Sequence, residues 1–302
     1  MFKNLLLYRL PAPWNITAAQ IEEALTAQAF TPCTSIDMQR TGWVAPRPNG
    51  DLVHSVNQQM LLCLQTEKKL LPSSVVNQFV KAKVAQIEEQ EGFKPGRKRM
   101  KEIKEETTDE LLPRAFSLLS QTKVWTDPVN GWLAIDAGSA GKAEEVLGLL
   151  IRAVERLPAE PIRVELSPVQ SMTDWLMQGE APFNFTIDQD TELRATGEGK
   201  ATVRFSNQSV EADDVNRHIT AGKRCIKLAL TWKDRISFVL TENLVIRKIK
   251  PLEVLSGEMN KKDGDEAEVF DADFALMAGE LNGLLADLVD ALGGFKQKAK
   301  AA

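Results

Sequence analysis

The sequence has few of the residues on which covalent frameworks, metal sites and many catalytic sites depend. Its three cysteines (Cys33, Cys63 and Cys225) are odd in number, far apart and without a CxxC pair. This pattern argues against a disulfide framework or a zinc site and is typical of reduced thiols in a cytosolic protein. The two histidines, His54 and His218, have no second His or Cys at metal-ligand spacing.

Long apolar runs are also missing. None approaches the roughly 20 residues of a membrane-spanning helix. The N-terminal stretch MFKNLLLYRLPAPWN has one short apolar segment and no small-residue cleavage site, so we predict a strand rather than a signal peptide. We expect a cytoplasmic protein without a membrane partner.

Motifs for nucleotide binding and nucleophilic catalysis are incomplete. Gly138-Ser-Ala-Gly-Lys142 resembles a phosphate-binding loop, but that motif needs a glycine where Asp136 stands and a hydroxyl side chain where Ala143 stands. We predict instead that Ser139 caps a helix. No GxSxG elbow occurs in the sequence. The sequence therefore predicts no enzyme activity, no metal and no cofactor.

The net charge of −5 argues mildly against a nucleic-acid-binding protein. The charges are, however, segregated along the chain. Residues 200–250 contain 11 cations and 5 anions, whereas residues 253–290 contain 2 cations and 11 anions. Such a distribution permits one face that attracts a polyanion and another that repels it.

The apolar pattern predicts an α+β fold with mostly antiparallel sheets, packed helices and a projecting helical arm. Strands are predicted at 2–10, 42–44, 59–65, 123–126, 132–137, 162–166, 224–232, 235–241 and 244–250, the last three as an antiparallel meander. Helices are predicted at 17–28, from 72 onward, and at 139–156, 173–177, 213–221 and 269–292. Turn formers and charges predict an irregular segment at 183–200 and a polar loop at 258–268.

These elements divide the chain into five predicted segments. They are the first part of a central α+β domain (1–71), the projecting arm (72–120), the return to the central domain (121–166), an irregular and helical base (167–222), and the meander with a C-terminal amphipathic helix (223–302).

The arm contains the most unusual stretch, from Gly92 to Trp125. Its first part has six cations against one anion, Glu102; the cations are Lys94, Arg97, Lys98, Arg99, Lys101 and Lys104. Pro95-Gly96 interrupts any helix here. The second part contains the apolar hexad Leu-Leu-Pro-Arg-Ala-Phe. The residues alone leave two interpretations open: an arm that contacts a polyanion and docks on a partner, or a solvated helix that leads back to the core.

Several motifs together resemble the bacterial recombination-associated protein RdgC family. They are FKNLLLYRL from Phe2, AFTPC from Ala29, GWV from Gly42, LLPRAFS from Leu111 with the following LLSQTKVWTDPVNG, and FDADFALMAGEL from Phe270. Each is weak alone, but their order and spacing are specific and cover almost the whole chain. The resemblance implies a non-enzymatic DNA-binding protein of the nucleoid, a ring-shaped homodimer with a basic hole for duplex DNA, which restrains the RecA recombinase.

The resemblance also assigns roles to individual residues. The phenylalanine of the LLPRAF motif, here Phe116 with Arg114 beside it, is expected at the tip of the arm, where it inserts into the partner subunit. A polar pair that grips DNA corresponds to Asn207 and Gln208. Lysine is usual at the first of these positions, and its absence here weakens the assignment of that contact.

Three groups of cations are candidates for binding DNA phosphates by charge. They are Lys68 and Lys69, directly after a predicted strand; Lys94, Arg97, Lys98, Arg99, Lys101 and Lys104 in the arm; and Lys223, Arg224, Lys227, Lys248 and Lys250 on the meander. Alternation places Lys227 opposite the packed face. For each lysine taken singly, a solubilising surface charge is the simpler interpretation. No helix has the clustered Asn, Gln and Arg of a recognition helix, which predicts sequence-independent contact.

Two functions from different classes follow. The first is a sequence-independent double-stranded DNA clamp. The second is a protein-interaction scaffold that uses the LLPRAF arm and the C-terminal helix without binding DNA directly. Salt dependence separates them, because phosphate contacts weaken steeply with salt and apolar docking does not.

Overall fold

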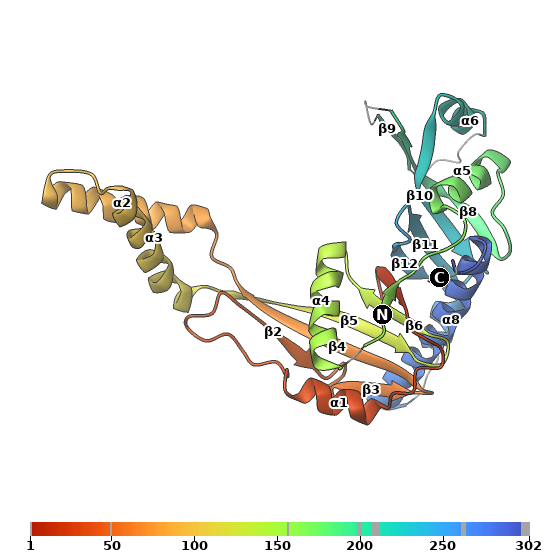
Figure 1. The fold of residues 1–302 in the computed structure, drawn as a ribbon, viewed down its shortest axis with the longest axis horizontal. Helices are drawn as coiled ribbons and strands as arrows, with labels where there is room; N and C mark the ends of the chain where they lie inside the picture. Colours follow the sequence, from red (N-terminus) through yellow and green to blue (C-terminus); the bar gives the residue numbers. More distant parts are fainter. Residues whose placement is uncertain are drawn as a thin grey trace, which may run out of the picture.

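The computed structural model describes residues 2–48, 50–155, 157–197, 201–206, 212–260 and 264–296. Figure 1 shows that these residues form a crescent, in which a long arm extends from a central region and a second limb of strands and helices rises at the other end. Within the described ranges, no helix combines the length and the apolar character that crossing a bilayer requires.

The elements alternate between strands and helices along the chain. The strands are β1 (Leu5–Arg9), β2 (Gln39–Val44), β3 (Val53–Val56), β4 (Gln59–Lys69), β5 (Ser117–Asp127), β6 (Trp132–Asp136), β7 (Glu160–Pro161), β8 (Phe185–Ala195), β9 (Thr202–Phe205), β10 (Lys223–Trp232), β11 (Ile236–Thr241) and β12 (Ile246–Pro251). The helices are α1 (Ala18–Thr26), α2 (Ser73–Glu91), α3 (Arg97–Leu111) with the 3-10 turn η1 (Leu112–Arg114), α4 (Ala140–Ala153), α5 (Pro168–Gln178), α6 (Ala212–Thr220), α7 (Glu253–Asn260) and α8 (Glu266–Ala291).

A single large sheet runs through the described structure. Its strand order is β2-β4-β5-β6-β1-β12-β11-β10-β8-β9, with β3 paired to β4 and β7 paired to β1. Neighbouring strands along this path are antiparallel, so the predicted α+β class is confirmed. The sheet takes strands from each of the five predicted segments, and the division into those segments stays a prediction.

Strand β1 joins the two halves of the sheet. On one side all of its residues pair with β6. On the other side the pairing with β12 is limited to Leu5 opposite Ile246, supported by a hydrogen bond from the Ile249 amide to the Lys3 carbonyl (3.0 Å). The backbone connection between the central strands and the meander is therefore narrow.

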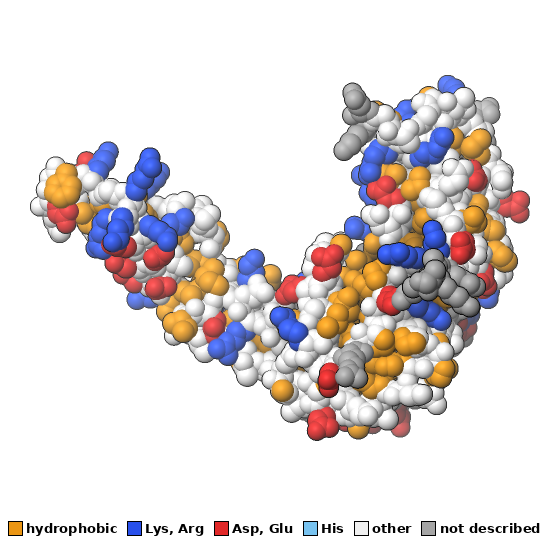
Figure 2. Space-filling view, in the orientation of Figure 1, with side chains coloured by type: hydrophobic (Ala, Val, Ile, Leu, Met, Phe, Trp, Pro, Cys, Tyr) orange, Lys and Arg blue, Asp and Glu red, His pale blue; other side chains and the backbone are white. Residues whose placement is uncertain are grey.

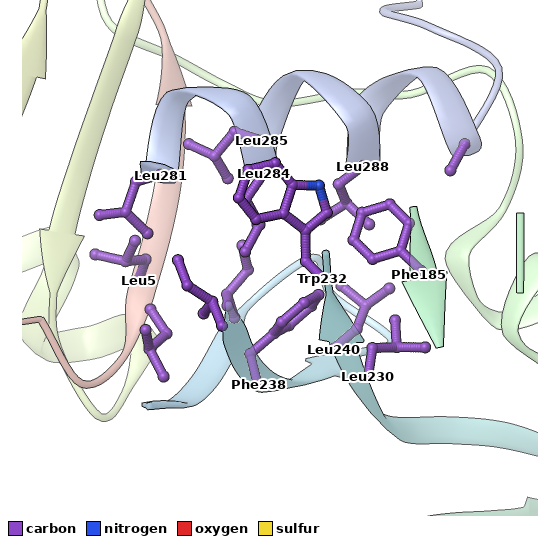
Figure 3. Packing of buried hydrophobic residues seen from close by; sticks show 14 of the residues in the cluster. Leu5, Phe185, Leu230, Trp232, Phe238, Leu240, Leu281, Leu284, Leu285 and Leu288 are labelled. Carbon is purple, nitrogen blue, oxygen red and sulfur yellow. The ribbon is translucent and has the colours of Figure 1, made fainter. Parts of the chain in front are cut away.

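Side-chain packing strengthens this junction. Helices α1 and α4 cover one face of the central strands, and α8 covers the opposite face and continues across the meander. Figure 3 shows Trp232 enclosed by side chains of α8 and of the meander. The Trp232 indole donates a hydrogen bond to Asp287 on α8 (2.7 Å). A Cβ on Gly283 would lie 3.0 Å from the Trp232 ring, so glycine lets the helix approach closely.

Local signals in the sequence explain several boundaries. Thr17 and Gln20 form a capping box at the start of α1, and Ser139 accepts a hydrogen bond from the Lys142 amide at the start of α4. The glycine-rich stretch before Lys142 is thus a helix cap, as predicted. In the arm, α2 ends at Gly92 and α3 begins after Gly96, which confirms the predicted interruption.

Four predictions about secondary structure were wrong. The strand predicted at 162–166 is not formed: β7 covers only Glu160–Pro161, and Val164 makes an isolated bridge with Phe295. Residues 183–200 are not irregular, because β8 occupies most of this segment. The polar loop predicted at 258–268 is partly helical, because α7 extends to Asn260 and α8 begins at Glu266. Strands β4 and β5 are longer than predicted, so Lys68 and Lys69 lie inside β4 rather than after it.

The arm has a very small core of its own. Helices α2 and α3 pack through Val76, Val80 and Ile103, which are buried, with a few half-buried neighbours. Figure 1 shows this helix pair projecting beyond the end of the β4–β5 ladder. The fold therefore holds the cations of α3 away from the main body of the protein.

Candidate nucleic-acid interface

The charges of α3 run against the electrostatics of a helix. The first turn contains Arg97, Lys98 and Arg99 and no acidic residue, and Gly96 supplies no side-chain cap. Anions stabilise a helix N-terminus and cations a C-terminus, so this order costs helix stability. Unpaired backbone amides at the same end add to the positive potential. Helix stability therefore does not explain why the cations gather here.

The six arm cations differ in how strongly other groups hold them. Arg99 lies 3.1 Å from Glu102 and 3.3 Å from Glu106, and hydrogen bonding to Glu102 is the main reason that its pKa is raised. Lys94 and Lys101 lie 4.0 and 3.5 Å from Glu88 and Glu105, respectively. In the described ranges no carboxylate lies within 4.0 Å of the remaining three, which are Arg97, Lys98 and Lys104. These three exposed cations are the ones most available to an incoming polyanion.

The LLPRAF motif lies elsewhere on the arm than the resemblance implies. Phe116 stands where η1 joins β5, and its carbonyl accepts a hydrogen bond from the Leu70 amide (2.7 Å). The far end of the arm is the turn at 92–96, so Phe116 belongs to the base of the helix pair. Its side chain is 83% exposed, and that of Arg114 is exposed as well.

An exposed apolar surface surrounds Phe116. Leu118, two residues along β5, points to the same side of the ladder, and Leu70 faces Phe116 across it. Both leucines are exposed. We call Leu70, Phe116 and Leu118 the arm-base patch. Lys68 pairs with Leu118, so this cation borders the patch, and half-buried Lys69 points to the other face.

On the other limb, carboxylates hold part of the predicted cation set. Lys227 and Arg204 both donate to Oε2 of Glu192, at 2.8 and 2.9 Å. The Lys227 ammonium is the main reason that the pKa of Glu192 is lowered. Lys248 lies 3.6 Å from Asp190. Lys227 is on the face opposite the packed residues, as predicted, but it is not simply a solvated charge.

Lys223 and Arg224 make local contacts near α6. The Lys223 ammonium lies 3.3 Å from Nδ1 of His218. The Arg224 guanidinium donates to the carbonyls of Ile219 and Lys223, at 3.4 and 3.0 Å. Both side chains are half-buried, so they stabilise the connection between α6 and β10. Asn207 and Gln208 lie outside the described residues.

The structure does not gather the three cation groups into one patch. Figure 1 places the arm and the strands β8–β12 on opposite limbs of the crescent, and Figure 2 shows Lys and Arg side chains on both limbs, many of them on the inner side. The sequence prediction did not include Arg204 and Arg247, two further cations on the second limb. Nor did it include Glu192, the carboxylate that holds Lys227.

The groups with possible chemical reactivity are mostly buried or paired. Burial raises the pKa of Cys63 to about 11 and that of Cys225 to about 12. Asp271 lies 3.0 Å from Arg47 and 3.2 Å from Nε2 of His54, so its carboxylate forms an ion pair with Arg47 beside the imidazole. Across the described part of the chain, no three His, Cys, Asp or Glu side chains are close enough to hold a metal ion.

Comparison with known proteins covers nearly the whole chain. A family model described as "Putative exonuclease, RdgC" matches residues 1–295. "Recombination-associated protein RdgC" of Janthinobacterium sp. (strain Marseille) is 60% identical over 297 residues, which is 98% of this chain and 99% of the relative. The protein of the same name from Cupriavidus pinatubonensis is 55% identical over 296 residues, again 98% of this chain and 99% of the relative. By sequence across its length, this chain belongs to the RdgC family of recombination-associated proteins.

Proposed function

We propose that this protein is a sequence-independent double-stranded DNA-binding protein that encircles duplex DNA as a ring-shaped homodimer and limits the access of the RecA recombinase. The observation that carries the proposal is a crescent whose two limbs both present cations (Figure 2). Two crescents joined at their ends would enclose a hole with cations along its wall. Since phosphate contacts carry no sequence information, such a protein would bind any duplex.

The arm supports this proposal because its charge order costs helix stability. The cations of the first turn destabilise α3 itself, and their presence there is explained if they bind a polyanionic ligand such as DNA. The arm also holds them at the end of a projection, where a duplex can reach them without displacing the body of the protein.

The arm-base patch supports the ring. An apolar surface that includes a Phe side chain 83% exposed is unfavourable in water and would be covered in a dimer. Burying one Phe contributes about 1.5–3 kcal/mol. In a symmetric interface the contribution occurs twice, so the patch can provide a substantial share of a dimerisation free energy.

We propose that the function is non-enzymatic, although the family model's description names an exonuclease. Occupying duplex DNA is sufficient to obstruct a recombinase at the nucleoid. The assay is incubation of end-labelled linear duplex with the protein and Mg²⁺ or Mn²⁺. We expect the DNA to remain intact. If the DNA is shortened from its ends, and this nuclease activity stays with the protein through further purification, the non-enzymatic proposal is overturned.

The central experiment measures binding to two unrelated duplexes of equal length by fluorescence anisotropy at several salt concentrations. We expect equal affinities and a log–log slope of magnitude roughly 5 or more, since each phosphate contact contributes about 0.9. Encirclement is tested separately, by comparing retention on a closed circular duplex and on the same duplex made linear. Loss from both forms at the same rate would contradict a ring, and unimpaired RecA strand exchange on the bound duplex would contradict the role in recombination.

A second candidate function is an interaction scaffold. It is favoured by one observation, the exposure of the arm-base patch. In that case duplex binding would be absent or independent of salt, and substitution of Phe116 would abolish a protein contact without changing any property of bound DNA.

A further inference from the structure

We propose that a pocket on the second limb is a binding site for a phosphate group of the DNA backbone, formed by Arg204, Lys227, Arg247 and Lys248. This inference rests on the proposed function and adds a specific contact to it. The pocket has a volume of about 300 Å³ and is lined by residues of β8, β9, β10, β11 and β12. Its charged lining consists of those four cations and two carboxylates, Asp190 and Glu192.

The first argument is the way the backbone assembles the pocket. In a regular strand, consecutive side chains point to opposite faces. Arg247 and Lys248 are consecutive in β12, yet both line the pocket. The reason is a register shift between β11 and β12, where Ser237 pairs with Lys250 but Val239 pairs with Arg247. Lys248 has a left-handed backbone conformation (φ 53°) at this bulge, so that it lines the same pocket as Arg247.

Two further irregularities lie beside the same pocket. The pairing of β10 with β8 shifts between Cys225 and Lys227, and again between Leu228 and Leu230. The second shift adds residues on the β8 side, next to Asp190. Bulges are concentrated where a protein redirects side chains for a function, and each of these three costs regular sheet hydrogen bonds. Their convergence on one cationic pocket favours a ligand over packing as the cause.

The second argument is an unsatisfied donor. Nε of Arg247 is shielded from solvent and has no hydrogen-bond partner among the described residues. A buried donor without an acceptor is costly, more so when it carries charge. A phosphate oxygen is a suitable acceptor, because guanidinium and phosphate form short, charge-assisted hydrogen bonds.

Glu192 has a specific place in this site. Its side chain is 10% exposed, and it already holds Lys227 and Arg204 at hydrogen-bond distance. A phosphate entering the pocket must share these two cations with Glu192. The carboxylate therefore acts as an internal competitor, which keeps the cations ordered in the absence of DNA and limits how tightly the duplex is held.

The test compares substitutions of opposite expected effect in the full-length protein. Arg247→Met with Lys248→Met keeps the side-chain stems and removes two charges; Glu192→Gln keeps the shape and removes the competitor. The matched control is Lys233→Met, since Lys233 lies 3.5 Å from Asp287 of α8, on the packed side of the sheet. Duplex affinity is measured by anisotropy at several salt concentrations, and binding of inorganic phosphate to the free protein by calorimetry.

We expect the double substitution to reduce the magnitude of the salt slope by about 0.9, because the pocket takes one phosphate group; this corresponds to about eightfold weaker binding at 0.1 M salt relative to 1 M. We expect Glu192→Gln to bind more tightly with a steeper slope, which a damaged fold would not produce, and Lys233→Met to match the wild type. If the wild type binds with a steep slope that neither change at the pocket alters, the pocket assignment is wrong and the proposed function stands. If inorganic phosphate binds but duplex affinity is unchanged, the site serves a free phosphate compound instead. If the wild type binds no duplex, both proposals fail.

Discussion

Reversing the first two charges of α3 should move DNA affinity and helix stability in opposite directions. Arg97 and Lys98 stand in the first turn, where acidic side chains are favoured, and neither is held by a carboxylate within the described structure. In Arg97→Glu/Lys98→Glu, two unfavourable interactions with the helix dipole become favourable ones. Each such interaction is typically about 0.3–1 kcal/mol. Amide hydrogen exchange in the N-terminal half of α3 should therefore become slower.

Duplex binding should weaken in the same variant. If both cations contact phosphates, the magnitude of the log–log salt slope falls by about 1.8, and affinity at 0.1 M salt falls by about 60-fold relative to a 1 M reference. Added repulsion from the new carboxylates increases this loss. Arg99 is left unchanged because Glu102 and Glu106 already hold it.

The control Lys81→Glu/Arg163→Glu has the same change in net charge at two other exposed positions. This control variant should retain most of the wild-type affinity for the duplex, because we attribute the loss of affinity to the position of the charges and not to the net charge of the protein. If Arg97→Glu/Lys98→Glu binds the duplex with undiminished affinity and an unchanged salt slope, the arm is not part of the DNA-binding surface. Weaker binding together with faster exchange in α3 would mean that the charges serve the fold, which contradicts the electrostatic reasoning.

Three further predictions concern other parts of the molecule. Phe116→Ser should raise the dimer dissociation constant by about 10²–10⁴-fold, since about 1.5–3 kcal/mol is lost at each of two symmetric sites. Analytical ultracentrifugation measures this constant, and a dimer mass that stays equal to that of the wild type across the dilution range would refute ring closure through the arm-base patch. Ile103→Ala should destabilise the arm by about 2–5 kcal/mol and raise proteolysis within 72–116, whereas equal exposure throughout the chain would show that the arm has no separate core. The pKa of Glu192 is lowered in the folded state, so its carboxylate stabilises the fold above its ordinary pKa, and this stabilisation is lost as the pH falls through the lowered value. When the pH is lowered below about 4.5, the melting temperature of Glu192→Gln should therefore fall less than that of the wild type; thermal unfolding at several pH values measures this.

Most of the fold could be predicted where side chains follow one period. The meander has alternating apolar residues, α8 has a continuous apolar stripe, and Thr17 and Ser139 are ordinary helix caps. Strand β8 was missed because it contains the charged residues Asp188, Asp190 and Glu192, and because the bulge at this point breaks the alternation. The ends of β4 and β5 were missed because they leave the core, so their outer residues no longer need to be apolar.

The candidate site could be predicted only in part. A run of cations in the arm is visible in the sequence. Whether each of these cations is paired with a carboxylate, however, depends on the face of α3 that it occupies. The pocket of the second limb could not be read from the sequence at all. Arg247 and Lys248 become neighbours on one face only through a bulge, and Glu192 reaches Lys227 only through the pairing of β8 with β10.

The central place of β1 has a consequence for how the protein is made. This strand leaves the ribosome first, yet one of its edges waits for β12, which begins at Ile246. Until then it pairs with β6 along its whole length and with the short β7 only at Tyr8 and Arg9, and the apolar face that α8 will cover stays open. Open strand edges and late contacts between distant residues favour aggregation during synthesis. Chains that end prematurely before residue 246 should therefore be strong clients of chaperones, whereas complete chains close the sheet in their last stage of folding.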